Sequence, residues 1–164
     1  MSSKLKISFL ILFGLLFSAC GNTSRCSSVP SEPVFIELNL LIEGHRHLNN
    51  QAFQNIYFTE RNRSIGVEHV GYGGVLITTF LGSSGVQYAA FDMTCPYEMD
   101  RNVRVFPISG FAAECSSCGS RFDLSNGLGM LTQGPAREHL RPLNIRRVYA
   151  HSVPYLIVTQ RHCR

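Results

Sequence analysis

The chain has 164 residues, which favours a single domain, and its 15 Lys and Arg against 11 Asp and Glu give a net charge of +4. Its two lysines, Lys4 and Lys6, both lie near the start, so a chain without that segment has 13 arginines against 11 acidic residues and a net charge of +2. A surplus this small does not indicate a nucleic-acid partner, and we expect none.

Residues 1–19 are expected to be a signal peptide. Lys4 and Lys6 form a basic start, and the apolar run over 7–17 is too short for an ordinary transmembrane helix. The run ends in Ser-Ala before Cys20, and small residues directly before a cysteine resemble the lipobox of bacterial lipoproteins. That resemblance implies lipidation of Cys20, membrane attachment through the lipid anchor, and a place in the bacterial cell envelope facing the periplasm or the cell surface. An ordinary signal peptide cleaved nearby is the alternative.

A tether and a run of short strands follow. Residues 20–33 are rich in Ser, Pro and Gly and predict a flexible tether, which leaves 34–164 for the domain. The apolar stretch 34–42 predicts a first strand with Glu37 and Asn39 on one face, and 44–55 is expected to be a loop or one helical turn. The remaining expected strands lie at 56–59, 75–80, 86–91, 110–113, 121–124, 146–151 and 154–159.

The spacing of these segments indicates the fold class. Residues 82–85 and the pair Asn126-Gly127 are hairpin signals, and a Ser-Val turn separates the last two strands. No segment beyond the signal peptide keeps helical periodicity for ten residues. We therefore expect an all-β domain, a small antiparallel β-sandwich or barrel.

Three of the six cysteines lie between residues 91 and 136. Cys95 follows a strand-like segment in a Thr-Cys-Pro-Tyr-Glu loop, and Cys115 and Cys118 form a C-x-x-C pair followed by Gly-Ser. Thiolates are ligands that zinc and iron–sulfur clusters prefer, and three convergent thiolates would repel one another without a cation. A C-x-x-C pair alone is equally typical of zinc sites, redox pairs and disulfides. The three cysteines together predict one metal centre at the tips of two loops.

These loops resemble the two cluster-binding loops of the Rieske [2Fe-2S] domain, and the resemblance extends over roughly 34–160. In that family one loop carries Cys-x-His and the other Cys-x-x-His before Gly-Ser, with two cysteines on one iron and two histidines on the other. Tyr97 and Cys118 stand here at the two histidine positions. The resemblance implies a Rieske-like fold with a two-loop cluster-binding subdomain, and it assigns contacts to the cofactor to Gly119, Ser120, Gly134 and Pro135.

The identity of a fourth ligand stays open. A tetrahedral site needs one, and no histidine stands beside either loop in the sequence. Tyr97 occupies the matching position, but a phenol must first lose its proton, whereas Glu98, one residue on, is a carboxylate. We favour Glu98 over Tyr97, with Asp100 further away and water or no ligand as other choices. Three arginines close to the loops could offset negative charge, or could be solvated: Arg101, Arg104 and Arg121.

Three functions are compatible with this pattern. The first is a lipoprotein with a Rieske-like domain that binds a [2Fe-2S] cluster and exchanges electrons with a redox partner protein. The second is a structural or binding module of the same fold without a cluster, in which Cys115 and Cys118 form a disulfide or bind zinc. The third is a thiol–disulfide oxidoreductase, which the absence of a βαβ pattern around the C-x-x-C disfavours. We expect an electron carrier or binding protein rather than an enzyme on its own.

Cys26 and Cys163 are the cysteines left after the lipid and the metal are assigned. They flank the domain, and the termini of compact domains are often close, so a Cys26–Cys163 disulfide is one prediction. Two free thiols are the alternative, because chain ends are rarely ordered.

Overall fold

The computed structural model describes residues 27–162, so the predictions for the signal peptide, Cys20, Cys26 and Cys163 lie outside the described residues. Within that range the regular secondary structure is almost all strand, and every pairing between named strands is antiparallel. The all-β antiparallel fold expected from the sequence is confirmed. In the described range no helix is both long and apolar enough to cross a membrane.

Three sheets make up the domain. The first has four strands in the order β10-β11-β1-β3. Its members are β1 (Val34–Asn39), β3 (Val67–Val70), β10 (Asn144–Ala150) and β11 (Val153–Thr159). The second has three strands in the order β2-β4-β5. Its members are β2 (Asn55–Phe58), β4 (Val75–Gly82) and β5 (Gly85–Asp92).

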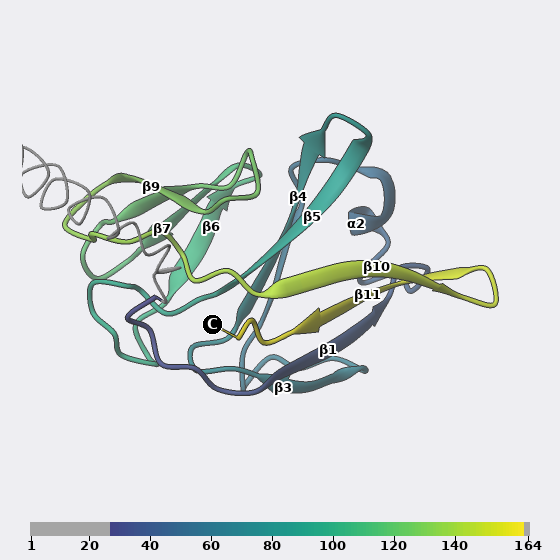
Figure 1. Ribbon diagram of the computed structural model, residues 1–164, viewed down its shortest axis with the longest axis horizontal. Coiled ribbons are helices and arrows are strands. Elements are labelled where there is room, and N and C mark those ends of the chain that lie inside the picture. Colours follow the sequence, from purple (N-terminus) through teal and green to yellow (C-terminus); the bar gives the residue numbers. More distant parts are fainter. Residues whose placement is uncertain (1–26, 163–164) are drawn as a thin grey trace, which may run out of the picture.

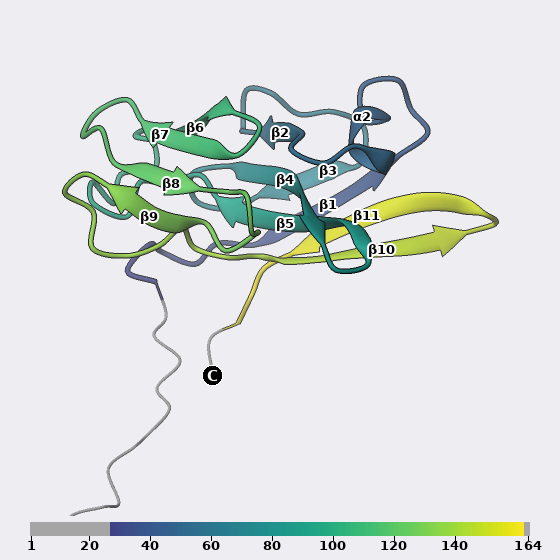
Figure 2. The same cartoon turned by 90° about the horizontal axis from the view of Figure 1, so that it is seen from above.

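The third sheet contains four consecutive strands in the order β6-β7-β8-β9. Its members are β6 (Val105–Ser109), β7 (Ala112–Cys115), β8 (Arg121–Asp123) and β9 (Met130–Gln133). This sheet lies at one end of the molecule, and the β10–β11 hairpin projects from the opposite end (Figures 1 and 2). A short helix, α2 (His47–Asn50), is the single helical turn expected between 44 and 55.

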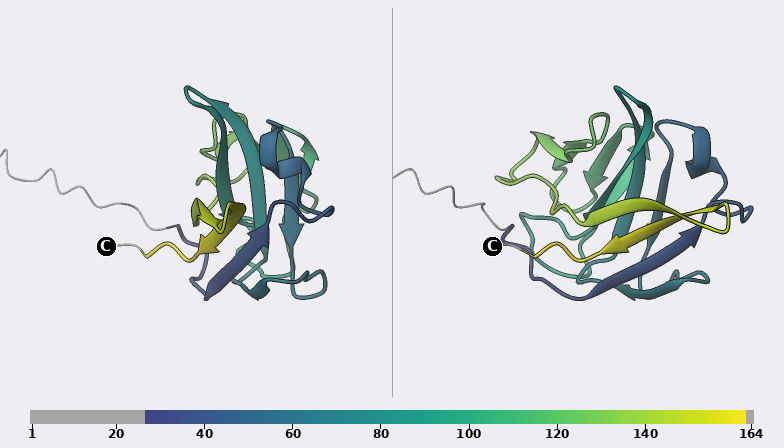
Figure 3. Two further views of the ribbon diagram at one scale, coloured as in Figure 1. Left: turned by 90° about the vertical axis from the view of Figure 1, so that its right-hand side faces the viewer. Right: turned by 45° about the vertical axis from the view of Figure 1, so that its right-hand side comes forward.

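The sheet of β2, β4 and β5 is buried on both faces. Along β4, Val75 and Ile77 pack with residues of the first sheet, whereas Leu76 between them packs with residues of the third. On β5, Ala90 belongs to the first of these cores and Phe91 to the second. The β4–β5 hairpin therefore separates two hydrophobic cores, and Figure 3 shows it rising between the other two sheets. A strand with two buried faces favours consecutive apolar residues, as at Val75, Leu76 and Ile77, which the buried Thr78 and Thr79 follow.

The expected strands are present, with three additions. The hairpin turn at 82–85 joins β4 and β5 as expected, whereas the last hairpin turns at His151 and Ser152, one residue before the expected Ser-Val pair. Strands β3, β6 and β9 are not among the expected strands. The β6 segment contains Pro107, which lacks an N–H donor, and such a strand is tolerated because β6 is an edge of its sheet. The four residues of β3, Val-Glu-His-Val, do not alternate between polar and apolar.

The first described residues are fixed to the domain by two side chains. Arg141, which is buried, donates hydrogen bonds to the carbonyls of Val29 and Pro30, and Val29 is itself buried. Glu138 accepts hydrogen bonds from the backbone N–H of Ser28 at 2.8 Å and from its hydroxyl at 3.1 Å. In the segment expected to be a tether, these residues are therefore held against the domain.

We predict that Arg141→Ala lowers the free energy of unfolding by about 2–4 kcal/mol, because two carbonyls lose a charged donor and the buried carboxylate of Asp92 loses a nearby cation. Denaturant unfolding of the purified protein measures the change. Arg146→Ala removes an exposed arginine and serves as the matched control, with an expected change within about 0.5 kcal/mol. Equal effects of the two substitutions would contradict the role given to Arg141.

Candidate metal centre

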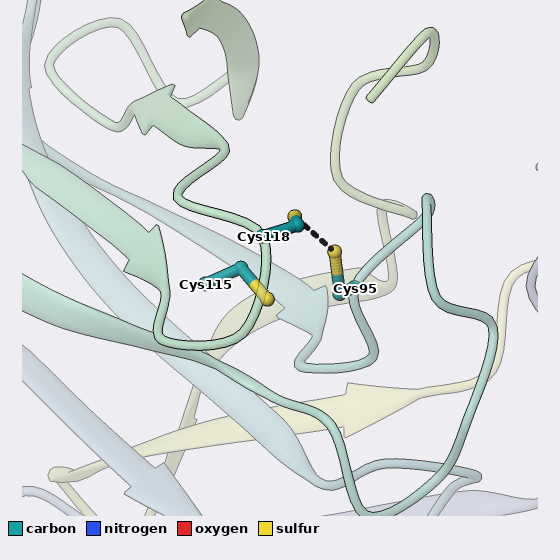
Figure 4. Close-up of side chains that lie close together, drawn as sticks. All are labelled: Cys95, Cys115 and Cys118. Carbon is teal, nitrogen blue, oxygen red and sulfur yellow. Dashed lines mark hydrogen bonds between the residues drawn. The ribbon is translucent and has the colours of Figure 1, made fainter. Parts of the chain in front are cut away.

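Three cysteine sulfurs converge between two loops. The Sγ atoms of Cys95, Cys115 and Cys118 all lie within 4.8 Å of one another. Cys95 comes from the loop after β5, Cys115 is the last residue of β7, and Cys118 lies in the turn between β7 and β8 (Figure 4). The Sγ atoms of Cys95 and Cys118, which come from different loops, lie 3.6 Å apart. The convergence predicted from the sequence is therefore present.

Backbone hydrogen bonds fix each loop around its cysteine. In the first loop, the N–H of Cys95 donates to the carbonyl of Val103, and the N–H of Met99 donates to the carbonyl of Cys95. In the second, Cys115 and Ser120 face each other across the turn, and the N–H of Gly119 donates to the carbonyl of Cys115 at 2.9 Å. Gly119 has a φ of +70°, a conformation that glycine adopts without strain. The C-x-x-C-G-S segment is thus a closed turn that directs both sulfurs to one side.

Ser120 connects the second loop to the segment 134–136. Its buried hydroxyl oxygen accepts a hydrogen bond from the N–H of Ala136 at 3.1 Å and lies 3.1 Å from the Sγ of Cys118. Gly134 permits this approach, because a Cβ at that position would lie 2.5 Å from the Cα of Ser120. Pro135 is exposed beside them. Of the four positions that the family resemblance marked, Gly119 and Ser120 therefore lie in the second loop, and Gly134 and Pro135 belong to the segment beside it. Their contact with a cofactor remains a prediction.

The three thiols differ in burial and in acidity. Cys95 and Cys115 have no exposed surface and belong to the core below the third sheet, whereas Cys118 is partly exposed. Burial raises the pKa of Cys95 to about 12, although the backbone N–H groups of Glu98 and Tyr97 act in the opposite direction. Burial also acts to raise the pKa of Cys118, but hydrogen bonds from the side chain and backbone of Ser120 and from the other two thiols outweigh it and leave the pKa lowered.

All three cysteines are free thiols in this structure. The Cys115–Cys118 disulfide considered as an alternative is therefore not the state described here. A metal bound by tetrahedral thiolates at about 2.3 Å places its sulfurs about 3.8 Å apart. The observed sulfur separations fit that requirement after small side-chain movements. Chemically, the arrangement can hold a thiophilic metal ion with three thiolates.

The fourth-ligand candidates make other contacts. The carboxylate of Glu98 accepts a hydrogen bond from the hydroxyl of Ser117 at 3.0 Å, which links the two loops. Tyr97 is 52% exposed. Among the described His, Cys, Asp and Glu residues, none joins the three sulfurs within 4.8 Å. Ligation by Glu98 or Tyr97 therefore stays a prediction.

The three arginines near the loops are engaged elsewhere. Arg101 forms an ion pair with Glu32 at 2.8 Å and lies over the ring of Tyr72. Arg104 donates to the backbone carbonyl of Gly73, and Arg121 pairs with Glu114 at 2.5 Å. These arginines thus contact neighbouring carboxylates and a carbonyl, and none of these contacts in the described residues is with a thiol. Sequence reasoning missed the Ser117–Glu98 link, since residues 19 apart in the chain give no local signal for it.

Comparison of the chain with protein-family models, with curated proteins and with solved structures gives no match.

We predict that the metal-free protein loses stability between about pH 9 and pH 12. The unfolded thiol of Cys95 ionises near its ordinary pKa of 9.0, whereas the folded thiol ionises only near 12, so the stabilising difference is complete below pH 9 and is lost through this window. Denaturant unfolding at several pH values measures the slope for the parent protein and for Cys95→Ala. The variant should lose stability less steeply with rising pH. Part of the loss that remains would come from Tyr88, because burial raises the pKa of its phenol as well. Identical slopes would contradict this origin.

Proposed function

We propose that this chain is a lipid-anchored protein of the bacterial cell envelope with a Rieske-like domain, and that its three thiolates hold an iron–sulfur centre that exchanges electrons with a partner protein. The observation that carries the proposal is the convergence of Cys95, Cys115 and Cys118 from two loops. Metals bind the deprotonated form of cysteine, so a bound cation would also remove the repulsion among the thiolates.

The loop architecture supports the iron–sulfur assignment. The Cys95 loop leads from β5 into the small sheet β6–β9, and Cys115 and Cys118 lie where β7 turns into β8 in that sheet, an arrangement that suits a two-loop cluster-binding subdomain. The Ser120 hydroxyl and the 134–136 segment lie against the second loop, where the resemblance expects them. Cys118 is partly exposed and Gly119 is exposed, so that a centre here would lie near the protein surface. A surface position suits electron exchange with another protein.

The charge of the ligands determines the reduction potential that we expect. Histidine-ligated Rieske clusters span roughly −150 to +300 mV, whereas clusters with four cysteines of the plant type lie near −400 mV. Thiolates at three positions, with a carboxylate from Glu98 as the proposed fourth ligand, add negative charge and oppose the entry of an electron. Arg101 and Arg121 are paired with Glu32 and Glu114, which offsets their charges, whereas Arg104 donates to the carbonyl of Gly73 and keeps its charge. We therefore expect a potential below the Rieske range.

A single zinc ion is the second candidate. The short distances among the three sulfurs favour it. In a two-iron cluster some protein ligands bind one iron and some the other, so they lie farther apart than ligands around a single ion. In that case the domain is a structural or binding module and transfers no electrons.

We predict near-stoichiometric iron and sulfide in protein that is expressed with ample iron and purified anaerobically, and a paramagnetic resonance signal after reduction. Cys118→Ser should lose most of the bound iron, because a hydroxyl is a poorer ligand for a soft centre. Ser116→Ala, an exposed neighbour in the same loop, is the matched control and should retain it. Zinc without iron would support the second candidate, whereas metal-free protein with a Cys115–Cys118 disulfide would contradict both.

We predict that Cys20→Ala releases the protein from membranes or leaves it unprocessed, because an acyl chain contributes about 0.8 kcal/mol for each buried CH₂ group. Membrane fractionation and intact-mass measurement follow the two effects. Normal processing and continued membrane binding of this variant would exclude the lipid anchor at Cys20.

A further inference from the structure

The described chain enters the domain beside the metal loops. The carboxylate of Glu138 accepts hydrogen bonds from the hydroxyl of Ser27 at 3.3 Å and from the N–H of Ser28 at 2.8 Å. Ser28 lines a hollow of about 540 Å³ together with Pro96 and Pro135. Because Pro96 follows Cys95 directly and Pro135 belongs to the segment that bonds Ser120, this entry point lies at the metal end of the molecule.

The chain length then limits how far this end can lie from an anchor at Cys20. Cys20 precedes Ser27 by seven residues. Even a fully extended chain of that length spans at most roughly 25 Å. The β10–β11 hairpin projects from the opposite end of the domain, as two perpendicular views show (Figures 1 and 2). An anchor at Cys20 would therefore hold the metal end close to the membrane and leave the hairpin farther away.

The surface around the entry point has the chemistry of a membrane interface. Tyr97 and Met99 line the hollow with Ser28 and are 52% and 48% exposed, and Leu128 lines a second hollow with Ser27 and is 61% exposed. Arg137 lies in both hollows and is exposed. An aromatic ring, two flexible apolar side chains and a cation are residue types that lie at the boundary between headgroups and acyl chains.

Two carboxylates at this end accept hydrogen bonds from serine donors of the protein itself. The carboxylate of Glu138 is hydrogen-bonded to Ser27 and Ser28, and that of Glu98 to Ser117. With one cation, Arg137, among the residues that line the two hollows, attraction to anionic lipid is a minor contribution compared with the anchor and the apolar side chains.

We propose that Tyr97, Met99, Leu128 and Arg137 form a membrane-facing surface that rests on the lipid bilayer, so that the metal centre faces the membrane. This proposal rests on the lipid anchor at Cys20 proposed above. The exposed thiol, Cys118, then lies on the membrane side of the domain, and the redox partner that reaches it is one held at the same membrane.

The absence of tryptophan from the sequence provides a clean probe. Leu128→Trp places a single tryptophan on the membrane-facing surface, and Tyr149→Trp, at a position that is 66% exposed near the tip of the β10–β11 hairpin, is the matched control. Each full-length, lipidated variant is incorporated into phosphatidylcholine–phosphatidylglycerol vesicles with or without brominated acyl chains. Bromine quenches tryptophan only at close range, so emission from Leu128→Trp should fall roughly twofold while emission from Tyr149→Trp stays unchanged.

Met99→Trp is a second probe on the same surface and should respond as Leu128→Trp does. Co-flotation of the protein with the vesicles separates the two levels of the proposal. Protein that floats while Leu128→Trp and Met99→Trp remain unquenched overturns the orientation and leaves the anchor intact. Protein that does not float overturns the anchor and the orientation with it. Quenching of Tyr149→Trp alone would show that the hairpin end faces the lipid and would also overturn the orientation.

Discussion

The burial of the β4–β5 hairpin on both faces is the constraint on which the rest of the domain depends. Because Val75 and Ile77 belong to one core and Leu76 to the other, neither core can form without this hairpin. The second core contains Cys95 and Cys115, and β5 leads directly into the loop that carries Cys95. The same hairpin that organises the fold therefore brings the first cysteine loop against the sheet that carries the second.

The fold could be read from the sequence wherever burial leaves a pattern in neighbouring residues. The apolar runs of β4 and β5, with two glycines at the turn between them, gave their positions to within about two residues. Strand β6 was not predicted, because Pro107 is a poor strand residue. This strand lies at the edge of its sheet and is held there by pairing with β7. Local pattern cannot reveal a strand whose stability comes from a partner.

In the candidate site, too, local features could be predicted from the sequence and long-range contacts could not. The three cysteines were predicted as one group because their spacing and their flanking turns are local features, and the sulfurs do converge. The contacts that hold the surroundings together were not predicted. Arg141 reaches Val29 across 112 positions of chain, and Ser117 reaches Glu98 across 19, so neither pairing leaves a trace in nearby sequence. The resemblance marked Ser120 without revealing that its hydroxyl lies between Cys118 and the N–H of Ala136.

The packing of Cys95 and Cys115 has a consequence for the order of assembly. As neutral thiols both behave as small apolar residues in a core that also contains Phe91 and Phe122, so the domain does not need a metal to complete that core. The domain can therefore fold before it binds a metal ion. An incoming ion would meet Cys118 first, as the thiol with access to solvent, and would recruit the two buried sulfurs only as they lose their protons. Metal binding would then require proton release from the buried Cys95 of a folded domain rather than a search by an unfolded chain for its ligands.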